Sequence, residues 1–458
     1  MTHTKVTTPL ALSIAGAIIF NLSPILFGYG MMMNLCFMVY GGSMIYLSVN
    51  DRRVLGYATV LTACNPANSL ANLSFSFLLA ILTILANSMA LKSVIHELNK
   101  DRWWRLFFAA FLLIILSVPF WSFGLRSFIT EGKQALSRLG YLVAFSLAVG
   151  LTFRTFRDGV RAMALLSLMS CSIFAIFYFI GQASLEEISA VVGGEAIGVQ
   201  QYIGNISLNF VRTQVCIPIA VLAATTLTFG VCIGLNWRAI PFYLASSVCV
   251  YLILKLASTG SAFAMVCGIG VMIAGYSLVR LSSGGGGGRI ILFTFIGLAL
   301  YMAVFQTDTA LLKRIELKSD QVATSGIDRQ VYWEKGIGEI MKSPFGEGWT
   351  WRTGHSDWLL FLLSYGWATG LLYIAAAGAL FFSMWRALFR NKGTRDNQSV
   401  MLPLAGLAAL SVYLVNANLD MLSANINYYQ IVWALVLTPA AVMMNPMPSS
   451  KPCRPMVR

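Results

Sequence analysis

The sequence predicts an all-α, polytopic membrane protein with 12–14 transmembrane helices. Hydrophobic residues make up 57% of the 458-residue chain and charged residues only 11%, whereas soluble globular domains carry roughly 25% charge. The mean hydropathy is +0.73. Apolar residues come in continuous runs rather than in the alternating pattern of a membrane β-barrel. We therefore expect a single integral membrane domain over residues 1–458.

The apolar runs are long enough to cross a bilayer, which takes about 20 residues each. No cleavage site follows the first run, so we expect it to stay as the first span rather than to be removed as a signal peptide. The expected spans cover residues 9–28, 31–49, 70–91, 106–123, 139–153, 162–181, 214–235, 239–255, 261–279, 290–306, 357–385, 400–418 and 425–444.

Two apolar runs have unusual lengths. The run at 54–64 (VLGYATVLTAC) is short and stops at Asn65–Pro66, so it is either a short span or a re-entrant piece. The run at 357–385 is the longest, and its length predicts a helix that tilts or protrudes from the bilayer.

The distribution of charge predicts the topology. With the N-terminus inside and 54–64 counted as a span, the inner segments hold 20 of the 32 basic residues but 5 of the 18 acidic ones. The outer segments then carry almost no net charge, so the positive-inside rule accounts for the whole net charge of +14. Both termini are expected to be cytoplasmic, and no nucleic acid is needed as a partner.

This topology leaves three outer loops of any size, at 124–138, 182–213 and 307–356. The last is the longest polar segment of the chain. Because backbone within the bilayer must be satisfied in helices, a membrane protein has few places for chemistry. The loop 307–356 is therefore the first place to look for function.

Two other features are interpreted as structural. The eight cysteines form no C-x-x-C pair and lie mostly in apolar runs, so we expect neither a disulfide framework nor a metal site. The glycine run 284–288 lacks the spacing of a phosphate-binding loop, and we interpret it as a flexible connector.

His355 is the one histidine predicted on the outer side, since His3 is at the N-terminus and His96 is in an inner loop. Its ordinary pKa near 6.5 suits a general base at neutral pH. A helix cap or an interfacial position is the structural alternative. A lone histidine cannot build a zinc site.

Basic and aromatic residues also gather on the outer side. Arginines that converge at one depth make a phosphate site, because the guanidinium fork matches phosphate oxygens, although a single arginine can simply snorkel to lipid headgroups. Tryptophans there either anchor the protein at the membrane interface or stack on sugars. The acidic residues show no spacing typical of a glycoside hydrolase pair. The basic residues on this side include Arg126, Lys133, Arg138, Arg212, Arg329, Lys335, Lys342 and Arg352, and the tryptophans are Trp333, Trp349, Trp351 and Trp358.

Three pieces of this region resemble, in order and spacing, the signature of the O-antigen ligase and polymerase superfamily. They are RQVYW at 329–333, PFGEG at 344–348 and HSDWLLFLLSYG at 355–366. In that family an Arg stands four residues before a Trp, a Pro-x-Gly-x-Gly turn follows, and a His precedes Leu at +4 and +7 and Gly at +11. The last three match Leu359, Leu362 and Gly366.

The resemblance implies a metal-independent, inverting glycosyltransferase without a cofactor, on the periplasmic face of a bacterial inner membrane. Residues 307–356 would be its large periplasmic catalytic loop. The donor would be an undecaprenyl pyrophosphate-linked polysaccharide and the acceptor a sugar hydroxyl of the lipid A core oligosaccharide, with membrane lipid around both. His355 would match the essential base, and Arg212 and Arg329 the arginines that bind pyrophosphate. Location alone adds Arg138 to the pyrophosphate site, and Trp333, Trp349 and Arg352 as glycan or acceptor contacts.

Two departures and two rival functions stay open. Ser356 stands where the family commonly has Asn, and Thr259–Ala262 (TGSA) lacks the Arg of a Ser-Arg pair that many members carry. A polysaccharide polymerase would use the same donor and a growing glycan as acceptor. A transporter would need ionisable or broken-helix sites at the midplane, and in the predicted spans Lys255 is the main internal charge, near a helix end.

Overall fold

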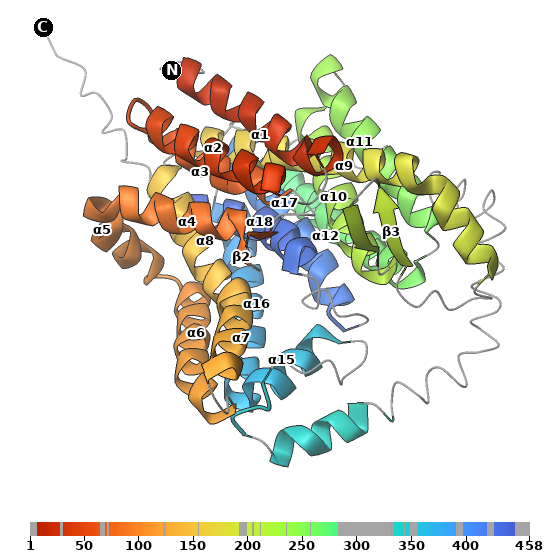
Figure 1. Ribbon diagram of the computed structural model, residues 1–458. Coiled ribbons are helices and arrows are strands. Elements are labelled where there is room, and N and C mark those ends of the chain that lie inside the picture. Colours follow the sequence, from red (N-terminus) through yellow and green to blue (C-terminus); the bar gives the residue numbers. More distant parts are fainter. Residues whose placement is uncertain are drawn as a thin grey trace, which may run out of the picture.

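The structure is a computed structural model of the chain. The residues that it describes are 7–27, 31–64, 69–70, 73–121, 125–153, 155–191, 199–203, 206–210, 212–234, 236–256, 258–282, 331, 333–342, 344–348, 356–390, 397–418 and 426–444. Over this part of the chain the protein is an all-α polytopic membrane protein with two small β-hairpins (Figure 1).

The N-terminal third forms a layer of helices that pack on one another in chain order. The apolar side chains of α1, α2 and α4 meet in a ring cluster in which Phe20, Phe37 and Phe75 lie with centroids 4.6–5.1 Å apart. The elements are α1 Thr8–Phe27, α2 Met31–Ser48, α3 Arg53–Thr62, β1 Ser69–Leu70, β2 Leu73–Ser74, α4 Phe75–Ala86 and α5 Ser88–Leu98.

The middle of the chain contains the longest of the described helices, α9 Phe156–Val191, and a π-helical segment. The elements are α6 Arg102–Trp121, α7 Leu125–Ala135, η1 Leu136–Gly140, α8 Tyr141–Thr152, α9 Phe156–Val191, β3 Val199–Ile203, β4 Ile206–Phe210, α10 Arg212–Ile233, η2 Trp237–Ala239, α11 Ile240–Lys255 and α12 Thr259–Ser282. The five residues of η1 are the π-helical segment, and they join α7 to α8 without a loop.

The C-terminal part begins with a helix over residues 333–342 and a turn at 344–348. The helices described after this turn are α15 Asp357–Tyr365, α16 Trp367–Arg390, α17 Asn397–Asn416 and α18 Ile426–Met444. Helix α16 lies along α6, and the Ser383 hydroxyl donates a hydrogen bond to Asp101 at 2.7 Å.

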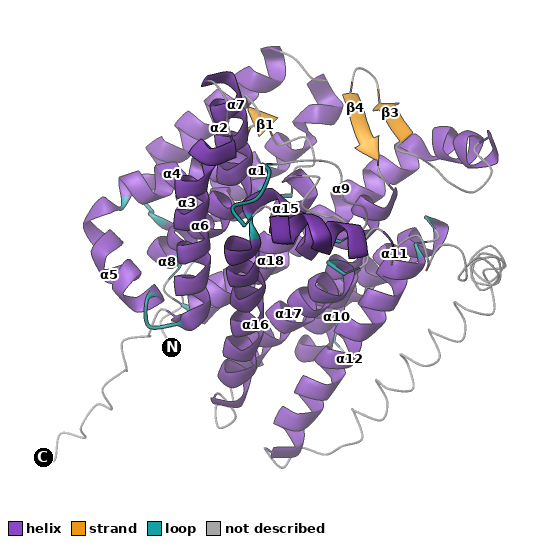
Figure 2. Cartoon of the chain, turned by 90° about the horizontal axis from the view of Figure 1, so that it is seen from below, coloured by secondary structure: helices purple, strands orange, loops and turns teal. Residues whose placement is uncertain are grey.

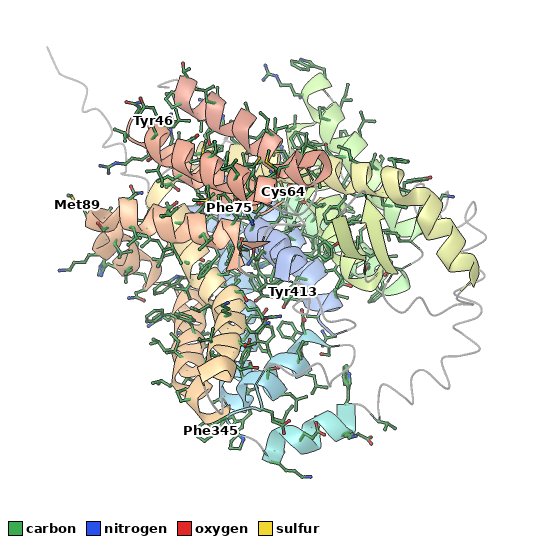
Figure 3. The ribbon with its side chains drawn as sticks, in the orientation of Figure 1. Tyr46, Cys64, Phe75, Met89, Phe345 and Tyr413 are labelled. Carbon is green, nitrogen blue, oxygen red and sulfur yellow. The ribbon has the colours of Figure 1, made fainter. Side chains whose placement is uncertain are left out.

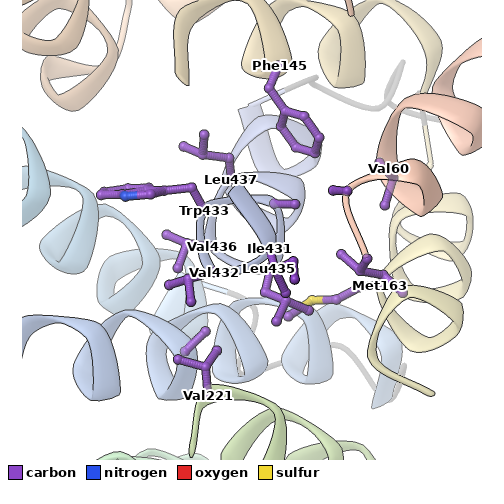
Figure 4. Close-up of a cluster of buried hydrophobic side chains, with 14 of the residues drawn as sticks. Val60, Phe145, Met163, Val221, Ile431, Val432, Trp433, Leu435, Val436 and Leu437 are labelled. Carbon is purple, nitrogen blue, oxygen red and sulfur yellow. The ribbon is translucent and has the colours of Figure 1, made fainter. Parts of the chain in front are cut away.

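The core of the molecule lies around α18. In Figure 4 its side chains, among them Val432 and Val436, are surrounded by residues of α3, α8, α9 and α10. All twelve residues of α8 are buried, whereas α1, α2, α11 and α16 leave large apolar side chains exposed. So many exposed large apolar side chains fit a surface in contact with lipid.

The predicted spans are largely confirmed as helices, and their number stays a prediction. Among the described residues, eight helices are long and apolar enough to cross a membrane, and a ninth follows if the bent pair α4–α5 counts as one. The predicted span 290–306 lies outside the described residues. The ambiguous run 54–64 is α3, whose residues Val54 to Thr62 are all buried inside the molecule.

Four boundary predictions are wrong. The run 357–385 is not one helix, because the chain breaks at Gly366 (φ +83°) between α15 and α16. The run 70–91 is broken at Asn87, where α4 and α5 meet at 107°. The expected loop 124–138 is helical and continues into α8. The expected loop 182–213 begins as the end of α9 and then forms the β3–β4 hairpin.

The two ends of the molecule differ in what they hold. Segments that the charge rule assigns to the inside meet at one end, where Thr7 and Arg53 both bond Asp51 and Arg53 also approaches Asp158 at 3.6 Å. Helix α15 and the 333–342 helix lie in the lower part of Figure 1, with α15 beside the lower ends of α6 and α7. We call this the α15 end.

Candidate functional site

The candidate site is at the start of α15, where the chain comes from the predicted catalytic loop. The Ser356 hydroxyl accepts the backbone N–H of Leu359 at 3.4 Å, and so caps the helix. The same hydroxyl donates to the Ala417 carbonyl at 3.1 Å, which also accepts the backbone N–H of Asp357 at 2.8 Å. The first turn of α15 is thereby tied to the end of α17. Figure 2, seen from this end, shows α15 in front of the helices that it covers.

The Pro-x-Gly-x-Gly turn packs on the other end of α15. The backbone N–H groups of Glu347 and Gly348 donate to the carbonyls of Leu363 and Ser364 at 3.0 and 3.1 Å. Figure 3 shows Phe345, in this turn, at the edge of the molecule next to α7 and α15. Two of the three motif pieces, 344–348 and 355–366, are thus hydrogen-bonded to one another.

Glycine is required at the crossing of the turn with α15. Gly346 and Gly366 both have positive φ, +84° and +83°. A Cβ on Gly346 would come within 2.5 Å of the Gly366 nitrogen, and a Cβ on Gly366 would overlap the Pro344 carbonyl. Both backbones approach too closely for a side chain. A Cβ on Gly348 would lie 3.2 Å from the Glu131 carboxyl carbon, which places this turn over α7.

The helix at 333–342 covers α15 from outside. Gly336 lies against Leu359, and Ile340 joins Leu359 and Leu363 in a small apolar cluster. Trp333, at the start of this helix, is 40% exposed, so its ring is available for the interfacial or sugar contacts that the sequence suggested.

Arg138 lies in the π-helical segment and is only 1% exposed. Its guanidinium donates to the backbone carbonyl of Gln134 at 3.2 Å and to the side-chain oxygen of the same residue. It lies within electrostatic reach of Tyr365, Tyr429, Asp357 and Glu131. π-Helical turns occur often at functional sites, and here the turn carries a buried charge.

Asp357 is fully buried beside three tyrosines from three helices. The hydroxyl of Tyr373 lies 2.6 Å from that of Tyr413 and 3.3 Å from that of Tyr429. We call these three the tyrosine cluster. Aromatic packing holds it, since Phe361 stacks on Tyr373 with centroids 4.1 Å apart and Trp358 contacts Tyr373 and Tyr413 at 5.8 Å. Figure 3 shows Tyr413 near the middle of the molecule, inward of α15.

The predicted site residues are described to different extents. Arg138 and Trp333 are placed as given above. Arg212 is the first residue of α10, and its side chain lies outside the described part. His355, Arg329, Trp349 and Arg352 lie outside the described residues, so their predicted roles stay predictions. Lys255 is the last residue of α11 and is exposed. Its predicted position near a helix end is confirmed.

Sequence reasoning missed the buried part of this site. The sequence patterns do not single out Asp357 or Glu131, and the three tyrosines lie within predicted apolar spans. The available signal was the Asp that directly follows the capping Ser at the start of an apolar helix. A carboxylate at this position is stabilised by the helix dipole. Among the described residues there is no group of three His, Cys, Asp or Glu side chains that could hold a metal ion.

No model of a known protein family matches the chain, and no curated protein matches it. The family resemblance therefore rests on the motif residues of the sequence alone.

Proposed function

We propose that the protein is a glycosyltransferase of the O-antigen ligase type. It would transfer polysaccharide from undecaprenyl pyrophosphate to a sugar of the lipid A core, on the periplasmic face of a bacterial inner membrane. The observation that carries the proposal is the ordered set of three motif pieces. Support comes from the contact between two of these pieces, because the 344–348 turn is hydrogen-bonded to α15. The 333–342 helix, which follows the first piece, packs on the same helix.

The proposed reaction needs a base and a site for the leaving group. A hydroxyl oxygen of the acceptor attacks the anomeric carbon of the donor, and the bond from that carbon to the pyrophosphate oxygen breaks. His355 takes the hydroxyl proton. Arg212 and Arg329 bind the departing undecaprenyl pyrophosphate, whose developing charge they stabilise. Attack opposite the leaving group inverts the anomeric centre, and no metal is required.

Trp333, Trp349 and Arg352 are the proposed contacts for the glycan or the acceptor. The exposure of Trp333 supports this role, since a ring must be open to solvent to stack on a sugar. Arg138 is a weaker choice as a direct phosphate ligand, because its guanidinium is buried against Gln134.

The test is transfer by the purified protein, given undecaprenyl pyrophosphate-linked glycan and lipid A core. We expect glycan on the lipid A core with wild type, its loss in His355→Ala, and unchanged transfer in the presence of EDTA. His96→Ala is the matched control, because His96 is exposed in the last turn of α5 and belongs to no motif. Equal transfer by both variants would contradict a role for His355.

The same assay separates the polymerase alternative. A polymerase would lengthen the glycan on its own lipid carrier and leave the lipid A core unmodified. The sequence leaves this alternative open because Thr259–Ala262 lacks the Arg of many family members, and both activities use one donor.

A transporter is the second candidate, and a specific observation favours it. Buried charge at Arg138 and Asp357, together with helix breaks at Asn87 and Gly366, is typical of transport sites in membranes. Proteoliposomes loaded with the lipid-linked glycan would then show movement of the glycan across the bilayer without any new glycosidic bond.

A further inference from the structure

Two opposite charges are buried together at the α15 end. Arg138 is 1% exposed and Asp357 is 0% exposed. Charged side chains are almost never buried to this extent unless another charge compensates them. Burial is the largest influence on the Arg138 guanidinium, and Asp357 is among the groups that act on it electrostatically, with Tyr365, Tyr429 and Glu131. Removing one charge would leave the other uncompensated in a medium of low dielectric constant, which is the costly case.

The elements around Asp357 all converge on the first residue of α15. Tyr373 comes from α16, Tyr413 from α17, Tyr429 from α18 and Arg138 from η1. The backbone of Asp357 is bonded to Ala417 at the end of α17.

The segment that carries Arg138 is itself tied to the same helices. The Gln430 side chain of α18 donates to the Ser137 carbonyl at 3.3 Å, and the Tyr141 hydroxyl donates to the Gln430 carbonyl at 3.4 Å. These bonds fix the π-helical turn against α18. The segments that carry the Arg138 guanidinium (η1) and the Asp357 carboxylate (α15) are therefore held together through α18 and the tyrosine cluster.

We propose that Asp357 is a positioning residue for glycan transfer, and that its charge, compensated by Arg138, fixes the start of α15. The proposal rests on the proposed function, in which the base, His355, is two residues before Asp357 in the chain. Asp357 itself touches no substrate, because it is fully buried. Arg138 acts here as the partner of Asp357 rather than as a ligand of pyrophosphate.

The test is a double-mutant cycle with Asp357→Asn, Arg138→Gln and the variant that carries both. Asp357→Asn is expected to lower kcat about tenfold or more and to leave the KM for the donor unchanged. The same result is expected for Arg138→Gln. The double variant should be less impaired than either single one, because no charge is then left uncompensated. Asp357→Glu, which keeps the charge, should retain more activity than Asp357→Asn.

Two matched controls identify the pair. Glu131 is the other carboxylate near Arg138, and Glu131→Gln should not rescue Arg138→Gln. Asp158 is a buried carboxylate 3.6 Å from Arg53, away from the α15 end, and Asp158→Asn should keep kcat. Equal loss of kcat in Asp158→Asn would mean that any buried carboxylate matters, and would overturn the proposal.

The outcomes separate this proposal from the proposed function. If wild type transfers glycan but the two single effects simply add, the positioning pair is overturned and the ligase stands. If Arg138→Gln raises the donor KM and Asp357→Asn has no effect, Arg138 binds phosphate directly. If wild type transfers nothing, the proposed function fails, and the positioning role fails with it. The apparent melting temperatures of the same four proteins still report whether the two charges compensate one another.

Discussion

At the scale of single residues, glycine is required where the backbone of the 344–348 turn passes close to the backbone at the end of α15. Gly366 combines φ +83° with ψ +159°, a region that is open essentially to glycine alone. Its α-carbon also faces the Pro344 carbonyl and Phe345. The family resemblance places a glycine at this position, and the geometry gives the physical reason for it.

Gly366→Ala is expected to destabilise the protein. The backbone strain alone costs about 1–3 kcal/mol, and the added Cβ overlaps the Pro344 carbonyl, so the turn must move. Gly378→Ala in α16 is the matched control, because nothing lies within 4 Å of its added Cβ. The apparent melting temperature of the detergent-purified protein measures both. A Gly366→Ala protein as stable as Gly378→Ala would contradict the crossing described here.

Asp51 is a second residue whose surroundings have a measurable consequence. Burial acts to raise the pKa of Asp51, but hydrogen bonds from Arg53 and Thr7 outweigh it and hold the pKa below its ordinary value. A carboxyl whose folded pKa is lowered contributes stability above its unfolded pKa, about 3.9. This stability is lost as the pH falls through the folded pKa.

Asp51→Asn should therefore lower the melting temperature at neutral pH, and the difference from wild type should shrink as the pH falls below about 4. Thermal unfolding of both proteins across this pH range is the measurement. Glu97→Gln is the control, because Glu97 forms an ion pair with the exposed Lys100, and such surface pairs contribute little. A difference between wild type and Asp51→Asn that stays constant with pH would refute the role of this carboxylate.

At the scale of elements, the start of α15 explains one departure from the family pattern. The family commonly has Asn where this chain has Ser356. Both residues are strong N-caps, and the Ser356 hydroxyl caps α15 here. Serine and asparagine could therefore supply the same cap at this position.

If Ser356 acts as the N-cap of α15, two substitutions at this position should have different effects. Ser356→Ala should cost about 1 kcal/mol of stability through loss of the cap, and Ser356→Asn should cost much less. Ser43→Ala is a control, because its exposed hydroxyl only bonds the Val39 carbonyl of its own helix. Melting temperatures and transfer activity of the three variants check the prediction. Equal losses from Ala and Asn at position 356 would show that the cap is not what this position supplies.

Sequence patterns predicted the helices well and their breaks poorly. Hydropathy finds α10 or α17 because every residue of a span contributes to the signal. It misses the breaks at Asn87 and Gly366, because apolar residues continue on both sides of each. The π-helical turn at Arg138 was also hidden, since its hydrogen bonds depend on α18 through Gln430 and Ser137. The buried charges at Arg138 and Asp357 depend on tertiary contacts that span more than 200 residues of sequence.

At the scale of the whole molecule, the charge distribution and the fold agree on one point. Thr7, Asp51, Arg53 and Asp158 belong to segments that the positive-inside rule places in the cytoplasm, and the structure brings them together at one end. The rule concerns insertion into the membrane and the contacts concern packing, so the two arguments are independent. The rule predicts that this end faces the cytoplasm and that the α15 end faces the other side of the membrane.

Impermeant maleimide labelling of single cysteines, in a background without native cysteines, measures that side. Lys342 is exposed in the 333–342 helix, and Lys100 is exposed in the turn between α5 and α6. Because excess basic residues are retained in the cytoplasm, we expect Lys342→Cys to be labelled on intact spheroplasts. Lys100→Cys should be labelled only after the membrane is permeabilised. The reverse pattern would put the α15 end in the cytoplasm, where a donor on the periplasmic leaflet could not reach it, and the proposed ligase would have to be abandoned.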